Sequence, residues 1–281
     1  MKVTVIGLGL IGGSMAITLR KEGIATELLG VDRNETNAEK AVELGLVDKI
    51  LPENEALPKS DFVIVSIPVN ATAALLPSVL DAVNENAVVI DVGSTKSLIT
   101  KAIANHPKRS QFVASHPIAG TEYSGPTAAF HGLFDGKTNI ICEREKSSER
   151  ALATAQKVFD ALKLKTIFME PVEHDKHVAY VSHLSHVSSF LLGQTVLDIE
   201  KDEKNIFDLA GSGFASTVRL AKSSPDMWAP IFEQNAEYLG QALAEYIMHL
   251  QKFQYHLMKH DVKELHKVMT KANEIKRVLD K

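Results

Sequence analysis

Cysteine, tryptophan and long apolar runs are scarce in this chain of 281 residues. Its one cysteine, Cys142, excludes an internal disulfide, and its place in the apolar run 139–142 favours a small buried strand residue. The lack of disulfides favours a reducing compartment. No apolar stretch has the length of a membrane span, and the chain begins with a predicted strand and not with a signal peptide. We therefore expect a cytoplasmic protein.

Charge of one sign is not concentrated anywhere in the chain. The 31 basic and 35 acidic residues leave a net charge of -4, and no block of like charges interrupts the sequence. This argues against a nucleic-acid surface or a membrane-binding patch. Hydrophobic residues make up 45% of the sequence, which with this length favours a globular protein of two domains, each with its own core. Any small anionic substrate must then be bound by a few local cations.

A glycine-rich string lies between the first predicted strand, residues 2–6, and a predicted helix over 15–20. Gly7 allows a tight turn, Gly9 lets the backbone approach a pyrophosphate, and Gly12 lets the helix pack closely on the strand. The free N–H groups at the helix start then face the phosphates. The predicted cofactor-binding residues of this loop are Gly7, Leu8, Gly9, Leu10, Ile11 and Gly12.

An acidic residue ends the next strand-like run, about 20 residues beyond the third glycine, where a dinucleotide-binding fold binds the adenosine ribose. This residue, Asp32, would accept hydrogen bonds from the ribose and repel a ribose phosphate, so NAD is favoured over NADP. Arg33 could stack on the adenine or meet that phosphate, which leaves NADP open. Ser66 and Pro68, at the end of the strand-like run 61–68, complete the predicted cofactor site.

The pattern of the chain changes near residue 170. Before it, short apolar runs such as 87–93 and 111–115 alternate with helical stretches, which predicts an N-terminal Rossmann-type doubly wound α/β sheet. After Pro171 helical spacing dominates, which predicts an all-helical C-terminal domain. We expect a dinucleotide-binding domain over 1–170 and a helical domain over 171–281, with helices near 174–199, 204–222, 226–251 and 254–279.

The last predicted helix carries one apolar stripe that another helix must cover. This stripe consists of Val262, Leu265, Met269, Ala272, Ile275 and Leu279. The cover could come from packing within the monomer or from a second copy of the chain. Small residues along the segment 182–189 would allow two copies to interlock, so a homodimer through the helical domain is favoured.

One histidine of the 11, His116, directly follows a predicted strand at the cofactor end of the sheet. An imidazole there can remove a hydroxyl proton while hydride leaves the same carbon, a contribution of typically 10²- to 10⁴-fold. Ser94 follows the preceding strand and could hydrogen-bond that hydroxyl or the imidazole. Equally, Ser94 could cap a helix that begins near Thr95.

The helical domain should supply the cations and donors for an anionic substrate. Arg219 follows a predicted turn that contains two glycines, and its guanidinium could bind a carboxylate in bidentate fashion. His183 and His186 lie three residues apart, hence on one helix face, and His174 and His177 repeat that spacing. No metal site is expected, because the histidine pairs are separated and no cysteine is near. Polar contacts to substrate are the better use of His183 and His186.

Several strings together resemble the prephenate dehydrogenases of tyrosine biosynthesis, over nearly the whole length of the chain. The most specific are His-Pro-Ile-Ala-Gly-Thr-Glu at 116–122 and Arg-Leu-Ala-Lys-Ser-Ser-Pro-Asp-Met-Trp at 219–228, which unrelated Rossmann dehydrogenases lack. The resemblance also covers the glycine loop, 93–96 and 181–186. It implies an NAD-dependent oxidative decarboxylation of prephenate to 4-hydroxyphenylpyruvate, or of arogenate to tyrosine.

The resemblance also assigns roles to residues. It implies that His116 is the base on the ring hydroxyl, Ser94 its partner, and Arg219 the ligand of a substrate carboxylate. His186 would be a further substrate contact. Thr121 and Glu122 would border the pocket, with Glu122 gating it through Arg219. Ser216 departs from the acidic residue that the family often has three positions before the arginine, which weakens the expectation of such a gate.

Two other functions compete with this reading. A dehydrogenase of small 3-hydroxy acids also joins a Rossmann domain to a helical one, but it would use a lysine of the helical domain as catalyst, and the string at His116 argues against it. An NAD-sensing protein would keep the glycine loop and Asp32 without a base. The presence of Ser94, His116 and Arg219 together makes an enzyme the better interpretation.

Overall fold

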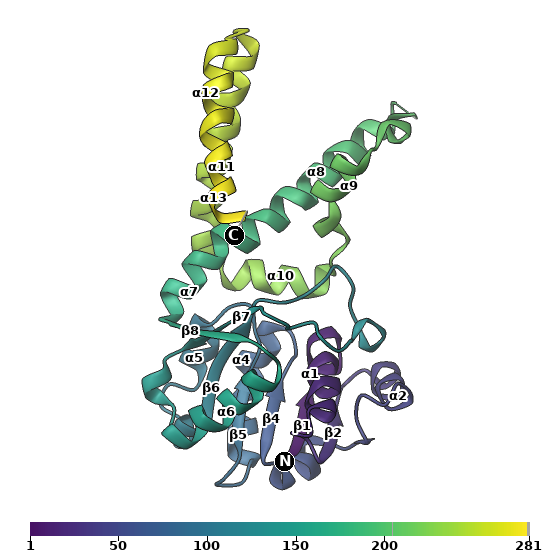
Figure 1. Cartoon of the computed structure of the whole chain (residues 1–281), viewed down its shortest axis with the longest axis vertical. Helices are drawn as coiled ribbons and strands as arrows, with labels where there is room; N and C mark the ends of the chain where they lie inside the picture. Colours follow the sequence, from purple (N-terminus) through teal and green to yellow (C-terminus); the bar gives the residue numbers. More distant parts are fainter. Residues whose placement is uncertain (204, 280–281) are drawn as a thin grey trace. The chain divides into compact units, whose positions relative to one another are not determined.

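Residues 2–169 contribute the strands of an eight-stranded sheet (Figure 1). The computed structural model describes residues 1–203 and 205–279 and divides into two compact units, Met1–Ala236 and Glu237–Lys281. The strand order is β3-β2-β1-β4-β5-β6-β7-β8. The strands are β1 (Lys2–Ile6), β2 (Glu27–Val31), β3 (Lys49–Ile50), β4 (Phe62–Val65), β5 (Val88–Asp91), β6 (Phe112–Pro117), β7 (Thr138–Cys142) and β8 (Lys165–Met169).

Strands β1 to β6 are parallel, which confirms the predicted doubly wound sheet for this part of the chain. Strand β7 runs antiparallel to β6, and β8 is parallel to β7. The sheet is therefore mixed, which the alternating pattern did not predict. The reason is local: the connection from β6 to β7 contains a short 3₁₀ turn, Pro126–Ala128, and no crossover helix, so the chain can return only in the antiparallel sense.

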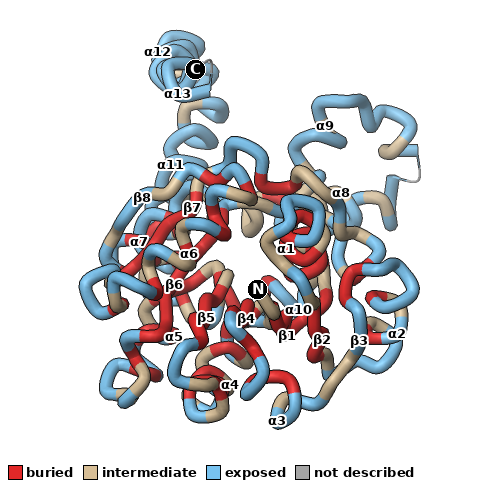
Figure 2. Tube along the Cα trace, turned by 60° about the horizontal axis from the view of Figure 1, so that its bottom comes forward, coloured by how far each residue is buried: buried red, intermediate tan, exposed pale blue. Residues whose placement is uncertain are grey.

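Helices cover both faces of the sheet. Residues of α1 and α6 join one core cluster with the strands, and residues of α4, α5 and α10 join the other. Figure 2 shows the buried residues gathered along the strands and the inner sides of these helices. The helices of the first unit are α1 (Leu10–Lys21), α2 (Glu35–Glu43), α3 (Glu53–Ala56), α4 (Val69–Ala82), α5 (Ser97–Ala102), α6 (Glu149–Ala161), α7 (Pro171–Val178), α8 (Leu184–Glu200), α9 (Ser212–Thr217) and α10 (Pro225–Gln234).

The helical region after β8 differs in detail from the prediction. Helices α7 and α8 are joined by a π-helical turn, Ala179–His183, so the first predicted helix is continuous but changes its pitch. The predicted helix over 204–222 is wrong as one element, and residue 204 lies outside the described residues. From 206 on, the segment forms two short 3₁₀ turns, Ile206–Leu209 and Arg219–Lys222, with α9 between them. Extended backbone at Gly211 separates the first turn from α9.

The second unit is helical and consists of the remainder of α11 (Ala236–Met258), α12 (Val262–Ala272) and α13 (Lys276–Leu279). The chain leaves α11 through His260, whose φ of 52° breaks the predicted helix over 254–279. Within this chain Val262 and Leu279 of the predicted apolar stripe are 73% and 72% exposed. Among the described residues no helix is long and apolar enough to cross a membrane.

Candidate active site

The glycine loop after β1 is packed tightly except at one position. Gly7 has a φ of +92°, and a Cβ there would lie 2.3 Å from the carbonyl oxygen of Ser66. A Cβ on Gly12 would lie 2.2 Å from the carbonyl oxygen of Gly7, so both positions require glycine. At Gly9 a Cβ would meet nothing within 4 Å. The loop is therefore held against β4 while open space remains over the N-terminus of α1, which is what a pyrophosphate needs.

The Asp32 carboxylate contacts this loop from the end of β2. Its Oδ2 accepts from the backbone N–H of Leu8 at 2.8 Å, and its Oδ1 accepts from Asn34 N–H at 2.9 Å. An open cavity of about 500 Å³ lies beside it, bordered by Asp32, Arg33, Leu51 and other residues of 31–54. Asp32 thus both anchors the glycine loop and faces the space where an adenosine would lie. Together with the open position at Gly9, these residues fit a dinucleotide.

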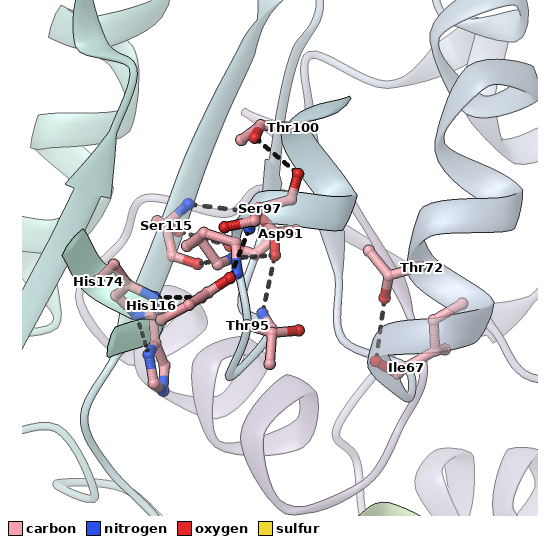
Figure 3. A network of polar contacts seen from close by, with 12 residues as sticks. Ile67, Thr72, Asp91, Thr95, Ser97, Thr100, Ser115, His116 and His174 are labelled. Carbon is pink, nitrogen blue, oxygen red and sulfur yellow. Dashed lines mark hydrogen bonds and ion pairs between the residues drawn. The ribbon is translucent and has the colours of Figure 1, made fainter. Parts of the chain in front are cut away.

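A hydrogen-bonded chain leads inward from the end of β6. His116 Nδ1 lies 2.8 Å from His174 Nε2, and His174 Nδ1 lies 2.8 Å from Asp175 Oδ1 (Figure 3). All three side chains are buried. Since the Asp175 carboxylate only accepts, His174 carries its proton on Nδ1 and accepts at Nε2. His116 must then donate from Nδ1, which leaves its Nε2 unprotonated and able to accept a proton.

The electrostatic surroundings of His116 and His174 favour the neutral form of both imidazoles. Burial, reinforced by the charges of His174 and Lys96, holds the pKa of His116 well below its ordinary value. Burial also lowers the pKa of His174, although Asp175 opposes the shift. Burial alone would raise the pKa of Asp175, but hydrogen bonds from His174 and Ser97 outweigh it, so that pKa is lowered. At neutral pH Asp175 is an anion, and His116 is a base without a bound proton at Nε2.

A fully buried ion pair holds the strand residue that precedes His116. Lys96 Nζ contacts Asp91 Oδ2 and donates to the carbonyl oxygen of Ser115 at 2.7 Å. Asp91 Oδ1 accepts from Ser115 N–H at 3.2 Å, and Ser115 Oγ donates to the Asp91 carbonyl at 2.6 Å. The backbone N–H of Lys96 donates to Asp175. The end of β6, and with it the His116 ring, is thereby fixed against β5 and α7 (Figure 3).

A second group of rings extends from Asp175 in another direction. Asn235 Nδ2 donates to the Asp175 carbonyl at 2.7 Å and lies 3.0 Å from His183 Nδ1. The His183 ring meets Trp228 edge-on, with ring centroids 5.8 Å apart. The His186 ring stacks on Trp228, with ring centroids 3.5 Å apart. The structure therefore brings the predicted His183 and His186 together with the string around Trp228.

Arg219 and Glu122 form the predicted pair, although Ser216 replaces the acidic residue of the family pattern. Arg219 Nη1 lies 2.9 Å from Glu122 Oε2, and their side chains are 50% and 14% exposed. The pKa of Glu122 is lowered, chiefly by a hydrogen bond from its own backbone N–H. Burial opposes this shift and Arg219 adds to it. Thr121 lies beside the pair and accepts from the N–H of Tyr123.

Other predicted residues stand apart from these contacts. The Ser94 side chain makes no hydrogen bond within the described residues, and the partner of the His116 imidazole is His174 instead. His177 is exposed while His174 is buried, so these two histidines do not contribute to one site together.

The sequence reasoning missed three residues of this site: His174 as the partner of His116, Asp175 and Asn235. It included Lys96 only within the segment 93–96 and gave it no role of its own. His174 was noticed only for its spacing from His177. An aspartate directly after a histidine, at 174–175, was the single local signal available.

Two family models and several known proteins match this chain. The family model of the prephenate dehydrogenase nucleotide-binding domain matches residues 15–168, and that of the prephenate dehydrogenase dimerization domain matches residues 170–271. Prephenate dehydrogenase of Bacillus subtilis is 30% identical over 98% of this chain and 75% of its own.

Two solved structures share the fold over the whole chain. Prephenate dehydrogenase of A. aeolicus, solved with hydroxyphenyl propionate and NAD⁺, has a TM-score of 0.88 and 31% identity, covering 100% of this chain and 99% of its own. Synechocystis arogenate dehydrogenase has a TM-score of 0.77 and 30% identity, covering 99% and 100%.

Proposed function

This chain belongs to the prephenate dehydrogenase family, and on that premise we propose that it oxidises and decarboxylates prephenate, with NAD⁺ as hydride acceptor. The observation that carries this proposal is the series of hydrogen bonds from Asp175 through His174 to His116. This series keeps Nε2 of His116 as a proton acceptor at the cofactor edge of the sheet. The open position at Gly9 and the placement of Asp32 support the binding of NAD.

His116 acts as the base. NAD⁺, when bound, supplies the acceptor for the hydride that leaves the carbon bearing the hydroxyl group. As the hydride leaves, His116 Nε2 takes the hydroxyl proton, and the hydrogen bond from its Nδ1 to His174 stabilises the imidazolium that forms. Loss of carbon dioxide makes the ring aromatic and returns an electron pair to the same oxygen, which recovers the proton from His116. Prephenate thus yields 4-hydroxyphenylpyruvate and carbon dioxide, and NADH carries the two electrons.

The remaining predicted residues bind and orient the two ligands. Residues 7–12 hold the pyrophosphate through the N–H groups at the start of α1, and Asp32 accepts from the ribose. Ser94 contacts the substrate hydroxyl, because the second nitrogen of His116 is already bound to His174. Arg219 binds a substrate carboxylate in place of Glu122, its partner in this structure.

Arogenate is the second candidate substrate, and one observation favours it. His186 Nδ1 donates to the carbonyl oxygen of Ser182 at 3.0 Å, so the neutral ring offers an acceptor at Nε2. An acceptor suits the ammonium group of arogenate, whereas the keto oxygen of prephenate needs a donor. Burial lowers the pKa of His186, with Arg219 adding to the effect, which favours this neutral form.

We further propose that residues 1–170 bind the dinucleotide and that residues 171–281 contribute substrate contacts and pair two copies of the chain. Two findings support a homodimer. The matching family model describes residues 170–271 as a dimerization domain, and the apolar stripe of α12 and α13 is largely exposed in the single chain.

The test is formation of reduced nicotinamide by the purified protein with prephenate and with arogenate, each against NAD⁺ and NADP⁺. Turnover of prephenate with NAD⁺ is expected, and turnover of arogenate alone would transfer the same mechanism to the second substrate. His116→Asn should lose 10²- to 10⁴-fold in turnover while its NAD⁺ affinity stays near that of the wild type. No turnover with any of the four pairs would refute the proposed function.

A further inference from the structure

Asn235 occupies the break between α10 and α11 and is buried. Its amide nitrogen has two hydrogens and two neighbours: the carbonyl oxygen of Asp175 at 2.7 Å and Nδ1 of His183 at 3.0 Å. A carbonyl oxygen can only accept, so the group facing it must be the NH₂ and not the amide oxygen. The second hydrogen of the same NH₂ then points to His183, whose Nδ1 must accept it.

This contact decides which nitrogen of His183 carries the proton. With Nδ1 accepting, the neutral ring has its hydrogen on Nε2. Nε2 is buried and has no hydrogen-bond partner among the described residues. An unpartnered donor in a buried position is uncommon in proteins and needs an explanation, and a group with a part in catalysis is one of those recognised.

We infer that Asn235 is a positioning residue that keeps His183 as a permanent hydrogen-bond donor, with its Nε2–H directed to an oxygen of the substrate. The inference rests on the proposed function for the identity of that substrate. Asp175 then fixes the protonation of two imidazoles in opposite ways, so that Nε2 accepts in one ring and donates in the other. Its carboxylate makes His116 an acceptor at Nε2, and its carbonyl, through Asn235, makes His183 a donor at Nε2.

An acceptor and a donor together suit a hydroxyl group that loses its proton and later regains it. The hydroxyl hydrogen is given to His116, while the oxygen can accept from His183 throughout. The titratable groups that act on His183 are Asp175, His174, His186 and His116. Burial lowers the pKa of His183 to about 4, against the influence of Asp175, so the ring stays neutral around pH 7. Its part is therefore to donate a hydrogen bond and not to exchange a proton.

The first experiment reads the proton directly and needs no substrate. In the full-length protein, NMR of the imidazole nitrogens, assigned by comparison with His183→Gln, should show His183 protonated at Nε2 and bare at Nδ1 around neutral pH. A proton on Nδ1 would overturn the inference whether or not the proposed function holds.

The second experiment separates donation from proton transfer. The amide nitrogen of glutamine can occupy the place of imidazole Nε2, whereas the shorter asparagine cannot reach it. The kcat/KM of His183→Asn should be roughly 10- to 100-fold below that of His183→Gln, the range for a lost hydrogen bond to a reacting group. Equal losses in both variants would overturn the inference.

The third experiment tests Asn235 itself. In Asn235→Asp the carboxylate must accept from His183 Nδ1, so the donor at Nε2 survives only while the ring is doubly protonated. The kcat/KM of this variant should fall as the pH rises through the pKa of His183, a limb that the wild type lacks. The same substitution placed on His183→Gln should show no such limb.

A merely structural role for Asn235 would lower activity by one factor at every pH in both backgrounds and would overturn the inference. Unchanged NAD⁺ affinity serves as the folding control. If Asn235→Asp fails this control, Asn235→Leu replaces it, with a loss of activity expected in the wild type but not on His183→Gln.

Discussion

The hydrogen bond between His116 and His174 should be worth one to two powers of ten in turnover. When His116 takes a proton, its Nδ1–H becomes a charged donor to His174 Nε2, 2.8 Å away and buried. Hydrogen bonds to charged groups contribute about 1.5–3 kcal/mol, and 1.36 kcal/mol corresponds to tenfold in rate. His174→Phe keeps a planar ring but offers no acceptor, so we expect kcat to fall by roughly 10- to 150-fold.

The matched control is His174→Gln, whose amide oxygen can accept from His116 and so preserve the protonation state of that ring. We expect it to retain most of the wild-type kcat. Steady-state rates of NADH formation with prephenate measure both variants, and NAD⁺ affinity verifies that the dinucleotide site is intact. If His174→Phe turned over within about threefold of the wild type while folded, the hydrogen-bonded chain would have no part in catalysis.

Three further results are expected. Gly9→Ala and Gly12→Ala should both weaken NAD⁺ binding, but only Gly12→Ala should lower the melting temperature. A Cβ on Gly12 would lie 2.2 Å from a backbone oxygen, whereas a Cβ on Gly9 meets nothing within 4 Å. Equal melting temperatures of the two variants would contradict this. Arg219→Lys should raise the KM for prephenate roughly 10- to 100-fold with little change in kcat, and an unchanged KM would remove Arg219 from carboxylate binding. The folded protein should lose stability in acid. The pKa of His183 is about 4 against an ordinary 6.5, so the unfolded chain binds the proton first as the pH falls. Neutral His183 contributes roughly 3 kcal/mol to the free energy of unfolding above pH 6.5, and this contribution disappears between pH 6.5 and about 4. Urea unfolding across that pH range would detect the loss. His183→Gln should lack this component.

The predicted sheet and cofactor loop could be derived locally. Strand, glycine turn and helix are contiguous in the chain, and the requirement for glycine at positions 7 and 12 follows from backbone contacts within that one unit and the adjoining strand. His116 was identified because it directly follows a predicted strand on the cofactor side. Apolar periodicity also located the helical region, although it did not report the breaks at Gly211 and His260, where backbone preference overrides the pattern.

Residue pattern and spacing alone therefore determined the fold class, the dinucleotide loop and the choice of His116 as the proposed base. The tertiary structure decided the protonation state of that base, because His116 meets His174 across 58 residues and Asn235 meets His183 across 52. Neither pair shares an element, so no periodicity connects its members. Their contacts depend on the packing that brings His174 of α7 to the end of β6, on the π-helical turn that carries His183, and on the break between α10 and α11 that holds Asn235. Hydrogen bonds between distant elements are set by packing, and packing is a property of the whole fold.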